Sequence, residues 1–290
     1  MLCRCLAISL AVVGADLGRP AFAQTDTTTP NIPGVVAAGT RVQLLVRGLQ
    51  GTEGPVAAPD GSLIFTEQNA NRISKIDANG RVTPFLSNTN GTIGLAYDSH
   101  GRLIAAQTIN PQIAVLLPTR DVLADSFEGS PLLRPNDLTV DSRGGIYFSD
   151  AAVLYIRPDG DVIKVADVDR PHGLALSPDE KILYVANTLD ETILAFDVHA
   201  DGTIAGRREF AKVATGGITV DSAGRVYVAT RIGVQIFSPQ GARLGTIPIG
   251  MADGPQNLAF AGFDRKTLFV VGRGAVWKVG MQAQGVRRAR

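Results

Sequence analysis

The residues that could do chemistry in this 290-residue chain stand at the start of a short sequence pattern that occurs six times. The pattern is one variable residue, a small or polar residue, a short apolar run and a turn. The variable residues lie 36 to 44 positions apart and are Glu53, Ile93, Asn136, His172, Gly216 and Gln256. A carboxylate, an amide and an imidazole among them could bind a divalent metal ion or transfer a proton.

The spacing of these positions predicts the fold. A period near 40 residues with several short strands per unit is typical of a β-propeller. In residues 171–202 three apolar runs are separated by turn residues, which suits strands. One such unit cannot bury both of its faces, so the chain is predicted to be an all-β, six-bladed propeller with four antiparallel strands per blade. The first strand of each blade lines the central channel, so the six residues should form one ring.

The two ends of the repeat array indicate how the ring closes. Residues 41–47 read as a strand without a unit of its own, and the last unit lacks its fourth strand. We therefore expect the N-terminal strand to join the last blade, which would remove exposed strand edges.

A second set of polar residues ends the second strand of each unit. Because that strand returns to the mouth of the channel, these residues could surround a site, or they could cap turns. Asp150 is a candidate for proton transfer, and Asn187 is a candidate substrate contact. The set comprises Glu67, Gln107, Asp150, Asn187, Thr230 and the exception Gly272. The recurring Asp98, Asp141 and Asp221 stand in D-x-x-G turns, so we interpret them as turn formers.

The N-terminus has the pattern of a cleaved secretory signal. Arg4 precedes an apolar run, and Ala21-Phe22-Ala23 forms a small-residue cleavage site, so we expect a cut after Ala23. Both cysteines lie within this segment, which leaves the mature chain without a thiolate. The protein should then be secreted or periplasmic. The expected divisions are a signal peptide (1–23), a flexible linker (24–40), the propeller (41–280) and a basic, solvated C-terminal tail (281–290).

The net charge and the absence of several known motifs limit the kinds of molecule that the protein is expected to bind. The net charge of +1 gives no basis for binding nucleic acid or an acidic membrane. The sequence has no P-loop, no G-x-S-x-G and no H-E-x-x-H motif. We expect a small-molecule substrate, no nucleic acid, no membrane contact after signal cleavage, and a monomer.

The repeats resemble the senescence-marker-protein/gluconolactonase family of six-bladed propellers, over residues 53–279. The resemblance rests on Glu53-Gly-Pro, on Arg134-Pro-Asn136-Asp137 and on the segment from His172 to Asn187. The family holds a divalent metal, often Ca²⁺, in its channel. The resemblance implies that Glu53 is a metal ligand, that Asn136 lies near the metal and contacts substrate, and that Arg134 contacts substrate.

Two residues depart from the family pattern. The resemblance places an Asn ligand at His172, and it places an Asp that acts as ligand and base at Gly216. Loss of an anionic ligand weakens a site for Ca²⁺, and an imidazole favours Zn²⁺ or Fe²⁺. Alternatively, His172 could act as a base without a metal. Asp137 and Asp253 lie close enough in sequence to ring positions to replace the missing carboxylate.

These residues support three hypotheses. The first is a metal-assisted hydrolase of lactones or related cyclic esters, in which Glu53, Asn136 and His172 bind the metal and His172 or Asp150 transfers the proton. In it, Arg134, Asn136 and Asn187 contact the substrate. The second is a non-catalytic propeller that binds a ligand or a protein. The third is another propeller chemistry, such as a lyase or a strictosidine-synthase-like condensation.

Overall fold

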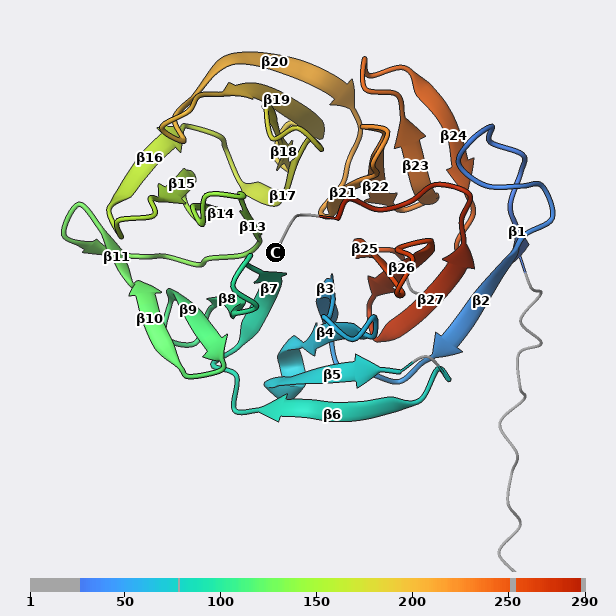
Figure 1. The fold of residues 1–290 in the computed structure, drawn as a ribbon, viewed down its shortest axis with the longest axis horizontal. Helices are drawn as coiled ribbons and strands as arrows, with labels where there is room; N and C mark the ends of the chain where they lie inside the picture. Colours follow the sequence, from blue (N-terminus) through green and yellow to red (C-terminus); the bar gives the residue numbers. More distant parts are fainter. Residues whose placement is uncertain (1–26, 78, 251–253, 288–290) are drawn as a thin grey trace, which may run out of the picture.

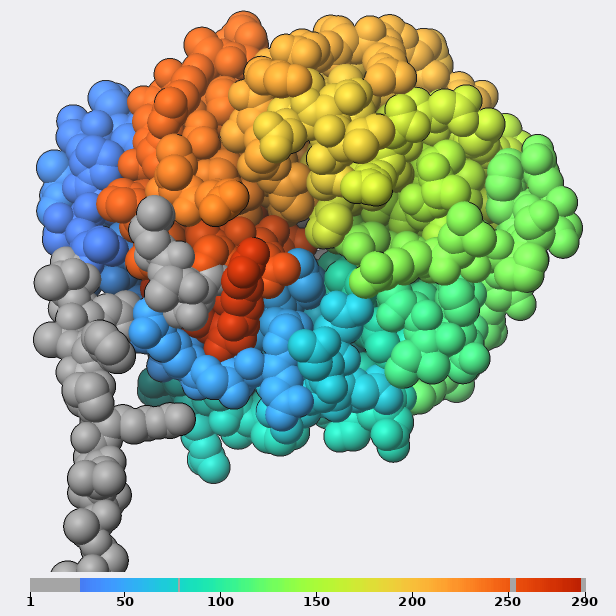
Figure 2. Space-filling view, turned by 180° about the vertical axis from the view of Figure 1, so that it is seen from behind, coloured from blue at the N-terminus to red at the C-terminus, as the bar shows by residue number. Residues whose placement is uncertain are grey.

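The computed structural model describes residues 27–77, 79–250 and 254–287, and these form a ring of six β-sheets (Figure 1). The prediction of an all-β, six-bladed propeller is confirmed. Seen from the other side, the blades pack next to one another around the centre (Figure 2). Within the described ranges the helical structure is one 3-10 turn, η1 (Gln68–Ala70), and no helix there is long and apolar enough to cross a membrane. The expected signal peptide lies outside the described residues.

Five blades each consist of four strands that follow one another in the chain, with the first strand innermost. Blades one and two contain β3 (Thr52–Ala57), β4 (Leu63–Glu67), β5 (Arg72–Ile76) and β6 (Val82–Ser87), then β7 (Thr92–Tyr97), β8 (Leu103–Gln107), β9 (Gln112–Leu117) and β10 (Asp121–Ala124). Blades three to five contain β13 (Leu138–Val140), β14 (Ile146–Ser149), β15 (Val153–Ile156), β16 (Val162–Ala166), β17 (Pro171–Leu176), β18 (Ile182–Asn187), β19 (Thr192–Val198), β20 (Ile204–Lys212), β21 (Ile218–Val220), β22 (Val226–Thr230), β23 (Gly233–Phe237) and β24 (Arg243–Ile247). A small hairpin, β11 (Ser126–Phe127) and β12 (Ser130–Pro131), connects blades two and three.

The sixth blade joins the two ends of the chain. Its inner strands are β25 (Asn257–Ala261), β26 (Thr267–Gly272) and β27 (Ala275–Gly280), and its outer strand is β2 (Arg41–Val46). β2 pairs antiparallel with β27, with Val42 opposite Val279. This pairing confirms that the N-terminal strand closes the ring. A short strand, β1 (Thr27–Thr28), extends the same sheet beyond β2.

The segments that flank the propeller differ from the expected linker and solvated tail. In residues 27–40, Val35 and Val36 are completely buried. The carbonyl oxygen of Val35 accepts hydrogen bonds from the backbone N–H groups of Gln282 (2.9 Å) and Ala283 (3.1 Å). Residues 27–40 and 281–287 are therefore part of the folded domain. Their Thr-, Pro- and Arg-rich composition suggested solvated chain, but a few apolar residues suffice once a matching groove exists.

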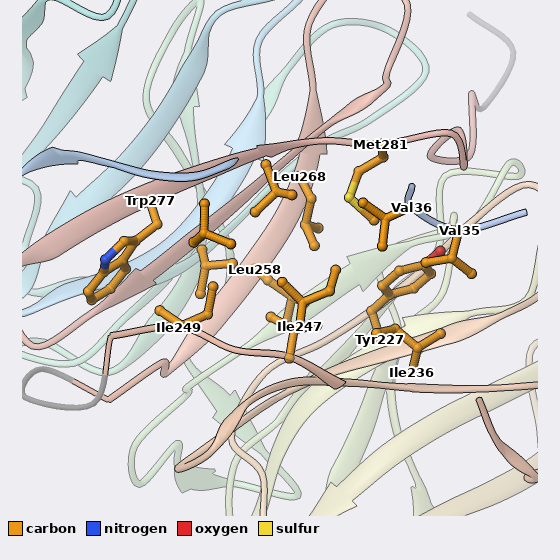
Figure 3. Close-up of a cluster of buried hydrophobic side chains, with 14 of the residues drawn as sticks. Val35, Val36, Tyr227, Ile236, Ile247, Ile249, Leu258, Leu268, Trp277 and Met281 are labelled. Carbon is orange, nitrogen blue, oxygen red and sulfur yellow. The ribbon is translucent and has the colours of Figure 1, made fainter. Parts of the chain in front are cut away.

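The largest buried cluster lies where blades five and six meet these flanking segments (Figure 3). Tyr227, Ile247 and Trp277 come from three different strands and pack near Val35 and Met281. Neighbouring blades pack against both faces of each sheet, so the second strands of the blades, such as β4, β8 and β22, are buried along their whole length and their buried positions do not alternate with exposed ones.

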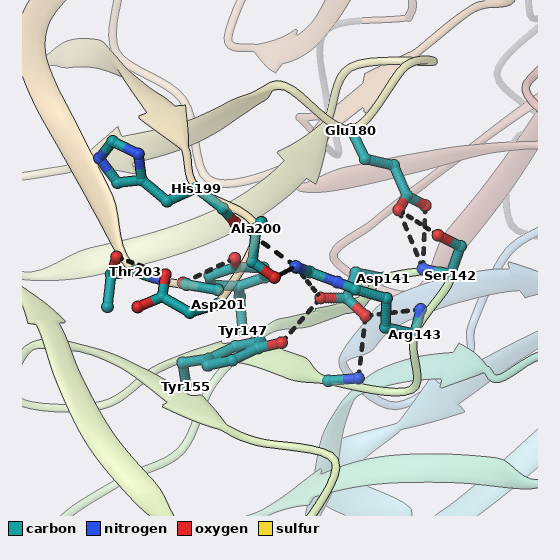
Figure 4. Close-up of polar contacts among 12 residues, drawn as sticks. Asp141, Ser142, Arg143, Tyr147, Tyr155, Glu180, His199, Ala200, Asp201 and Thr203 are labelled. Atoms are coloured by element: carbon teal, nitrogen blue, oxygen red, sulfur yellow. Dashed lines mark hydrogen bonds and ion pairs between the residues drawn. The ribbon is translucent and has the colours of Figure 1, made fainter.

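The recurring aspartates form turns, as the sequence predicted. Asp141 accepts hydrogen bonds from the backbone N–H groups of Arg143 and Gly145, and from the hydroxyl of Tyr155 at 2.8 Å (Figure 4). The Arg143 guanidinium lies 2.7 Å from the same carboxylate. Asp221 has the matching contacts in blade five, with Arg225 and Tyr227. These carboxylates are saturated by their neighbours and are unsuited to catalysis.

Candidate functional site

The predicted ring exists, and it surrounds a cavity of about 690 Å³ at one end of the channel. This volume lies within the usual range for small-molecule sites. Five of the six ring residues line the cavity: Glu53, Ile93, Asn136, His172 and Gln256. The sixth, Gly216, contacts the site through its carbonyl oxygen, which lies 3.0 Å from Nδ1 of His172.

Local irregularities help to aim these side chains. In β3, β7 and β17 the pairing register shifts close to the ring position. Such a bulge bends the strand and redirects the neighbouring side chain. The ring residues therefore diverge from the regular alternation of the strands and face the axis.

The residues that follow the ring positions form a second, narrower layer. Four of them are glycines, and the blades approach so closely there that side chains do not fit. A Cβ atom on Gly54 would lie 2.0 Å from the carbonyl oxygen of Ile93, and one on Gly94 would lie 2.7 Å from that of Asn136. The six members of this layer are Gly54, Gly94, Asp137, Gly173, Gly217 and Asn257. Asp137 and Asn257 therefore supply its side chains.

Glu53, which lines the cavity, and the Asp137 and Asn257 side chains directly beneath it form a buried group that we call the floor. Nδ2 of Asn257 donates to Oε2 of Glu53 (3.3 Å) and to Oδ2 of Asp137 (3.2 Å). All three residues are buried. On the far side of this layer lies a smaller cavity of about 190 Å³, lined in part by Gly285 and Val286 of the C-terminal segment.

Burial changes the acid–base properties of the floor. Desolvation and the nearby Asp137 carboxylate raise the pKa of Glu53 to about 7, and desolvation raises the pKa of Asp137 to about 6. Two carboxylates that share one amide donor, with no cationic side chain of the described residues paired to them, cannot both ionise easily. Near neutral pH the pair therefore tends to retain a proton.

Asn136 and His172 lie above this floor with unused hydrogen-bonding capacity. The Oδ1 atom of Asn136 is buried and accepts no hydrogen bond from the described part of the chain. A carbonyl can only accept, so Nδ1 of His172 must donate to Gly216, which leaves the lone pair of a neutral imidazole on Nε2. Desolvation, together with the charge of Arg134, lowers the pKa of His172. His172 is thus a neutral imidazole with a free acceptor atom.

His172 and Gly216, the two positions where the resemblance led us to expect a different residue, are adjacent in space. A Cβ atom on Gly216 would lie 3.3 Å from Cε1 of His172, which is closer than most real contacts of this kind. The imidazole therefore occupies space next to a position that needs to be small. A carboxylate side chain at residue 216 would compete with His172 for that space.

Asp150 and Asn187 are not among the residues that line the cavity. The Asp150 carboxylate accepts hydrogen bonds from the backbone N–H groups of Leu133 and Arg134. The side chain of Asn187 accepts from the N–H of Asp190 and donates to its carboxylate. Both residues cap loops, which is the alternative interpretation of the second polar set.

Glu67 of the same set is also satisfied locally. Its carboxylate forms an ion pair with Arg72 at 2.8 Å and accepts a hydrogen bond from the Ser74 hydroxyl, and these contacts lower its pKa in spite of burial. This residue stabilises blade one and does not reach the channel cavity.

The donor atoms around the cavity fit a divalent cation. Glu53 supplies an anionic oxygen, Asn136 an oxygen without a hydrogen-bond donor, and His172 a free Nε2. The raised pKa of Glu53 is what a carboxylate shows when a positive partner is missing. In the described part of the chain no cluster combines three or more His, Cys, Asp or Glu side chains in a metal-binding arrangement, so an amide would have to complete the set.

The floor residues could have been predicted from the sequence by comparing the residues that directly follow the six ring positions. The six residues that directly follow the ring positions are four glycines and two polar residues, and none of them has an apolar side chain. Asp137 was a candidate replacement carboxylate, and the structure places it deeper than the ring residues. Asn257 and Arg273 were not anticipated, and Asp253 lies outside the described residues.

Fold and site together define a six-bladed propeller with a blind, polar cavity at one end of its channel. The family model for the SMP-30/Gluconolactonase/LRE-like region matches residues 51–273, and the chain belongs to this family. The family predicted from the sequence is thereby confirmed.

Individual relatives are similar along most of the chain. A gluconolactonase from Zymomonas mobilis subsp. mobilis is 27% identical over 292 residues, covering 83% of this chain and 82% of the relative. The structure of a gluconolactonase from Xanthomonas campestris has a TM-score of 0.81 at 27% identity, covering 89% of this chain and 95% of the other. Regucalcin from Agrobacterium tumefaciens, a calcium-binding protein, shares the fold with a TM-score of 0.74 at 18% identity, with coverages of 86% and 97%.

Proposed function

We propose that the protein hydrolyses lactones or related cyclic esters in the cavity above Glu53. Membership of the family and the likeness to gluconolactonases from two bacteria support the reaction class. The observation that carries the proposal is the buried, unpartnered Oδ1 of Asn136 in the same cavity as Glu53 and a neutral His172. Buried acceptors are normally satisfied by protein, by ordered water or by a bound ion, so this atom is available to accept from a hydroxylated ligand or to bind a cation.

The chain's own residues can carry the proton transfers of ester hydrolysis. Nε2 of His172 accepts a proton from water as the water oxygen bonds to the carbonyl carbon. The bond from that carbon to the ring oxygen then breaks, and His172 returns the proton to the leaving oxygen, which gives a hydroxy acid. Asp150 is engaged by backbone N–H groups, so His172 is the better placed of the two proposed bases.

As an alternative role for His172, we propose that Glu53, Asn136 and Nε2 of His172 hold a divalent metal ion; Nε2 is then a ligand, and Asp150, the other proposed base, would have to take the proton. When bound, such an ion polarises a carbonyl and lowers the pKa of water. The imidazole favours Zn²⁺ or Fe²⁺, whereas the oxygen donors also suit Ca²⁺. The site differs from the family pattern at His172 and Gly216. The N-terminal sequence supports export, with removal of residues 1–23.

The test is a lactonase assay on protein stripped with a chelator and then loaded with Ca²⁺, Zn²⁺, Fe²⁺ or Mn²⁺. We expect turnover of D-glucono-δ-lactone, and a loss of at least ~100-fold in Glu53→Gln, as is usual when a directly acting group is removed. Glu209→Gln on the exposed outer strand β20 is the control and should retain activity. Failure of every metal form on sugar lactones and aryl esters would favour the non-catalytic binding alternative.

A further inference from the structure

The charged groups of the cavity are arranged with opposite signs at its two ends. Glu53 lies at the buried floor, whereas Arg134 and Arg273 line the cavity and are exposed at its rim. Across the described ranges, neither arginine forms an ion pair with a side chain. The other polar residues of the lining carry no charge, and the neutral imidazole of His172 is one of them; the rest are Gln50, Gln68, Asn69, Asn136 and Gln256. The rim is therefore cationic and lacks a counter-charge among these residues.

Both arginines are held in place by contacts through their backbone. Arg273 lies between two glycines in the β26–β27 turn with φ of 46°, a left-handed conformation that favours glycine over residues with a side chain. Its N–H donates to the side chain of the ring residue Gln256 at 2.8 Å. Arg134 is held in the same manner, because its N–H donates to the Asp150 carboxylate.

The turn between β26 and β27 in blade six both reverses the chain and places a cationic side chain at the cavity. Glycine would adopt the conformation of Arg273 without strain. A long cation stands there instead, fixed by a residue of the ring and directed to the same cavity as a second cation from blade three. Its place in the cavity lining and its hydrogen bond to Gln256, rather than the turn conformation, mark Arg273 as a candidate ligand contact.

We propose that Arg134 and Arg273 form an arginine rim that selects lactones bearing a carboxylate substituent, with Arg273 as a new specificity residue. The proposal rests on the lactonase function and names its substrate class. Guanidinium groups bind carboxylates through paired, charge-assisted hydrogen bonds. A carboxylate is repelled by Glu53 at the floor, so the substrate would enter with its carboxylate at the rim and its ester carbonyl toward His172.

The test compares two lactones that differ only at carbon 6: D-glucaro-1,4-lactone, with a carboxylate, and D-glucono-1,4-lactone, with a hydroxymethyl group. We expect the native protein to prefer the acidic lactone by about tenfold or more in kcat/KM, the value of one charge-assisted contact. Arg273→Gln should lower that preference about tenfold by raising KM for the acidic lactone alone, and Arg273→Lys should restore part of it. Arg231→Gln, an exposed arginine in the β22–β23 turn, is the matched control.

Binding measurements separate this proposal from the reaction itself. Calorimetry requires no turnover. Glucarate should bind more tightly than the uncharged polyol D-glucitol, in a manner that depends on Arg273 and weakens with salt. If glucarate binds in this way but neither lactone is hydrolysed, carboxylate recognition by the arginine rim is supported and the proposed lactonase function is refuted. If both lactones are hydrolysed equally well and Arg273→Gln affects both alike, the rim is refuted and the lactonase function stands. Absence of both glucarate binding and turnover overturns both.

Discussion

Replacing Glu53 by glutamine should stabilise the metal-free protein while removing its activity. The Glu53 carboxylate is buried and shares one amide donor with Asp137, and no cationic side chain of the described residues pairs with it. Glutamine keeps the shape and an oxygen that can accept from Asn257, but it cannot carry a charge. The substitution therefore removes the free-energy cost of a buried negative charge beside Asp137 and leaves the shape and packing of the side chain nearly unchanged.

The pKa of Glu53 gives the size and the sign of the effect. Folding raises this pKa from its ordinary value of 4.5 to about 7. Between these pH values the folded state binds more protons than the unfolded state, so the free energy of unfolding falls as pH rises. Above about pH 7 the loss approaches roughly 3 kcal/mol, since each tenfold change in proton affinity corresponds to about 1.4 kcal/mol. Glu53→Gln escapes this loss at high pH and gains little near pH 4.5.

The measurement is a thermal unfolding series with a chelator present, at pH 5 and at pH 8. For a protein of this size we expect Glu53→Gln to exceed the native Tm by about 6 °C at pH 8 and to differ little from it at pH 5. Adding a divalent cation should raise the native Tm and leave the variant unchanged, because ligand binding stabilises only the protein that holds the ligand. Glu209→Gln should follow the native protein throughout.

Two results would refute this reasoning. One is a variant that is less stable than the native protein at pH 8, which would mean that the carboxylate has a stabilising partner. The other is a Tm difference of the same size at both pH values, because a difference independent of pH cannot arise from ionisation of Glu53.

Two further predictions concern the layer below the ring and the loop that carries Arg134. Gly54→Ala should destabilise the fold by about 3 kcal/mol or more, because its Cβ would lie 2.0 Å from a neighbouring carbonyl oxygen and its φ is positive, whereas Gly280→Ala, with no atom within 4 Å, should be close to neutral. Urea unfolding of both variants measures this, and equal stabilities would contradict it. Asp150→Asn should raise KM severalfold by loosening Arg134 while the pH profile of kcat stays unchanged. A large fall in kcat together with loss of the acidic limb of that profile would instead make Asp150 the base.

The repeat was readable from the sequence because each blade needs the same few residues at the same places. A period of 36 to 44 residues and apolar runs between turns predicted six blades, and the unpaired segment 41–47 predicted how the ring closes. The ring residues followed from topology alone, since the first strand of every blade lines the channel. Five of the six line the cavity as expected.

The flanking segments show where local composition fails. Residues 27–40 have no periodic pattern, yet Val35 and Val36 are buried, and Val35 holds the C-terminal segment by backbone hydrogen bonds. Whether an irregular segment is solvated depends on the surface next to it, and that surface is made by blades distant in sequence. The amino-acid composition of residues 27–40 therefore cannot predict whether they are buried.

By itself, the sequence determined the number of blades, the closure and the identity of the residues around the axis. The tertiary structure decided how those residues interact. Asn257 can bridge Glu53 and Asp137 only because four glycines let the blades approach until these side chains meet across the channel. The distance to the axis, and hence the charge balance between the floor and the arginine rim, is set by the packing of six sheets against one another, and no single repeat encodes it.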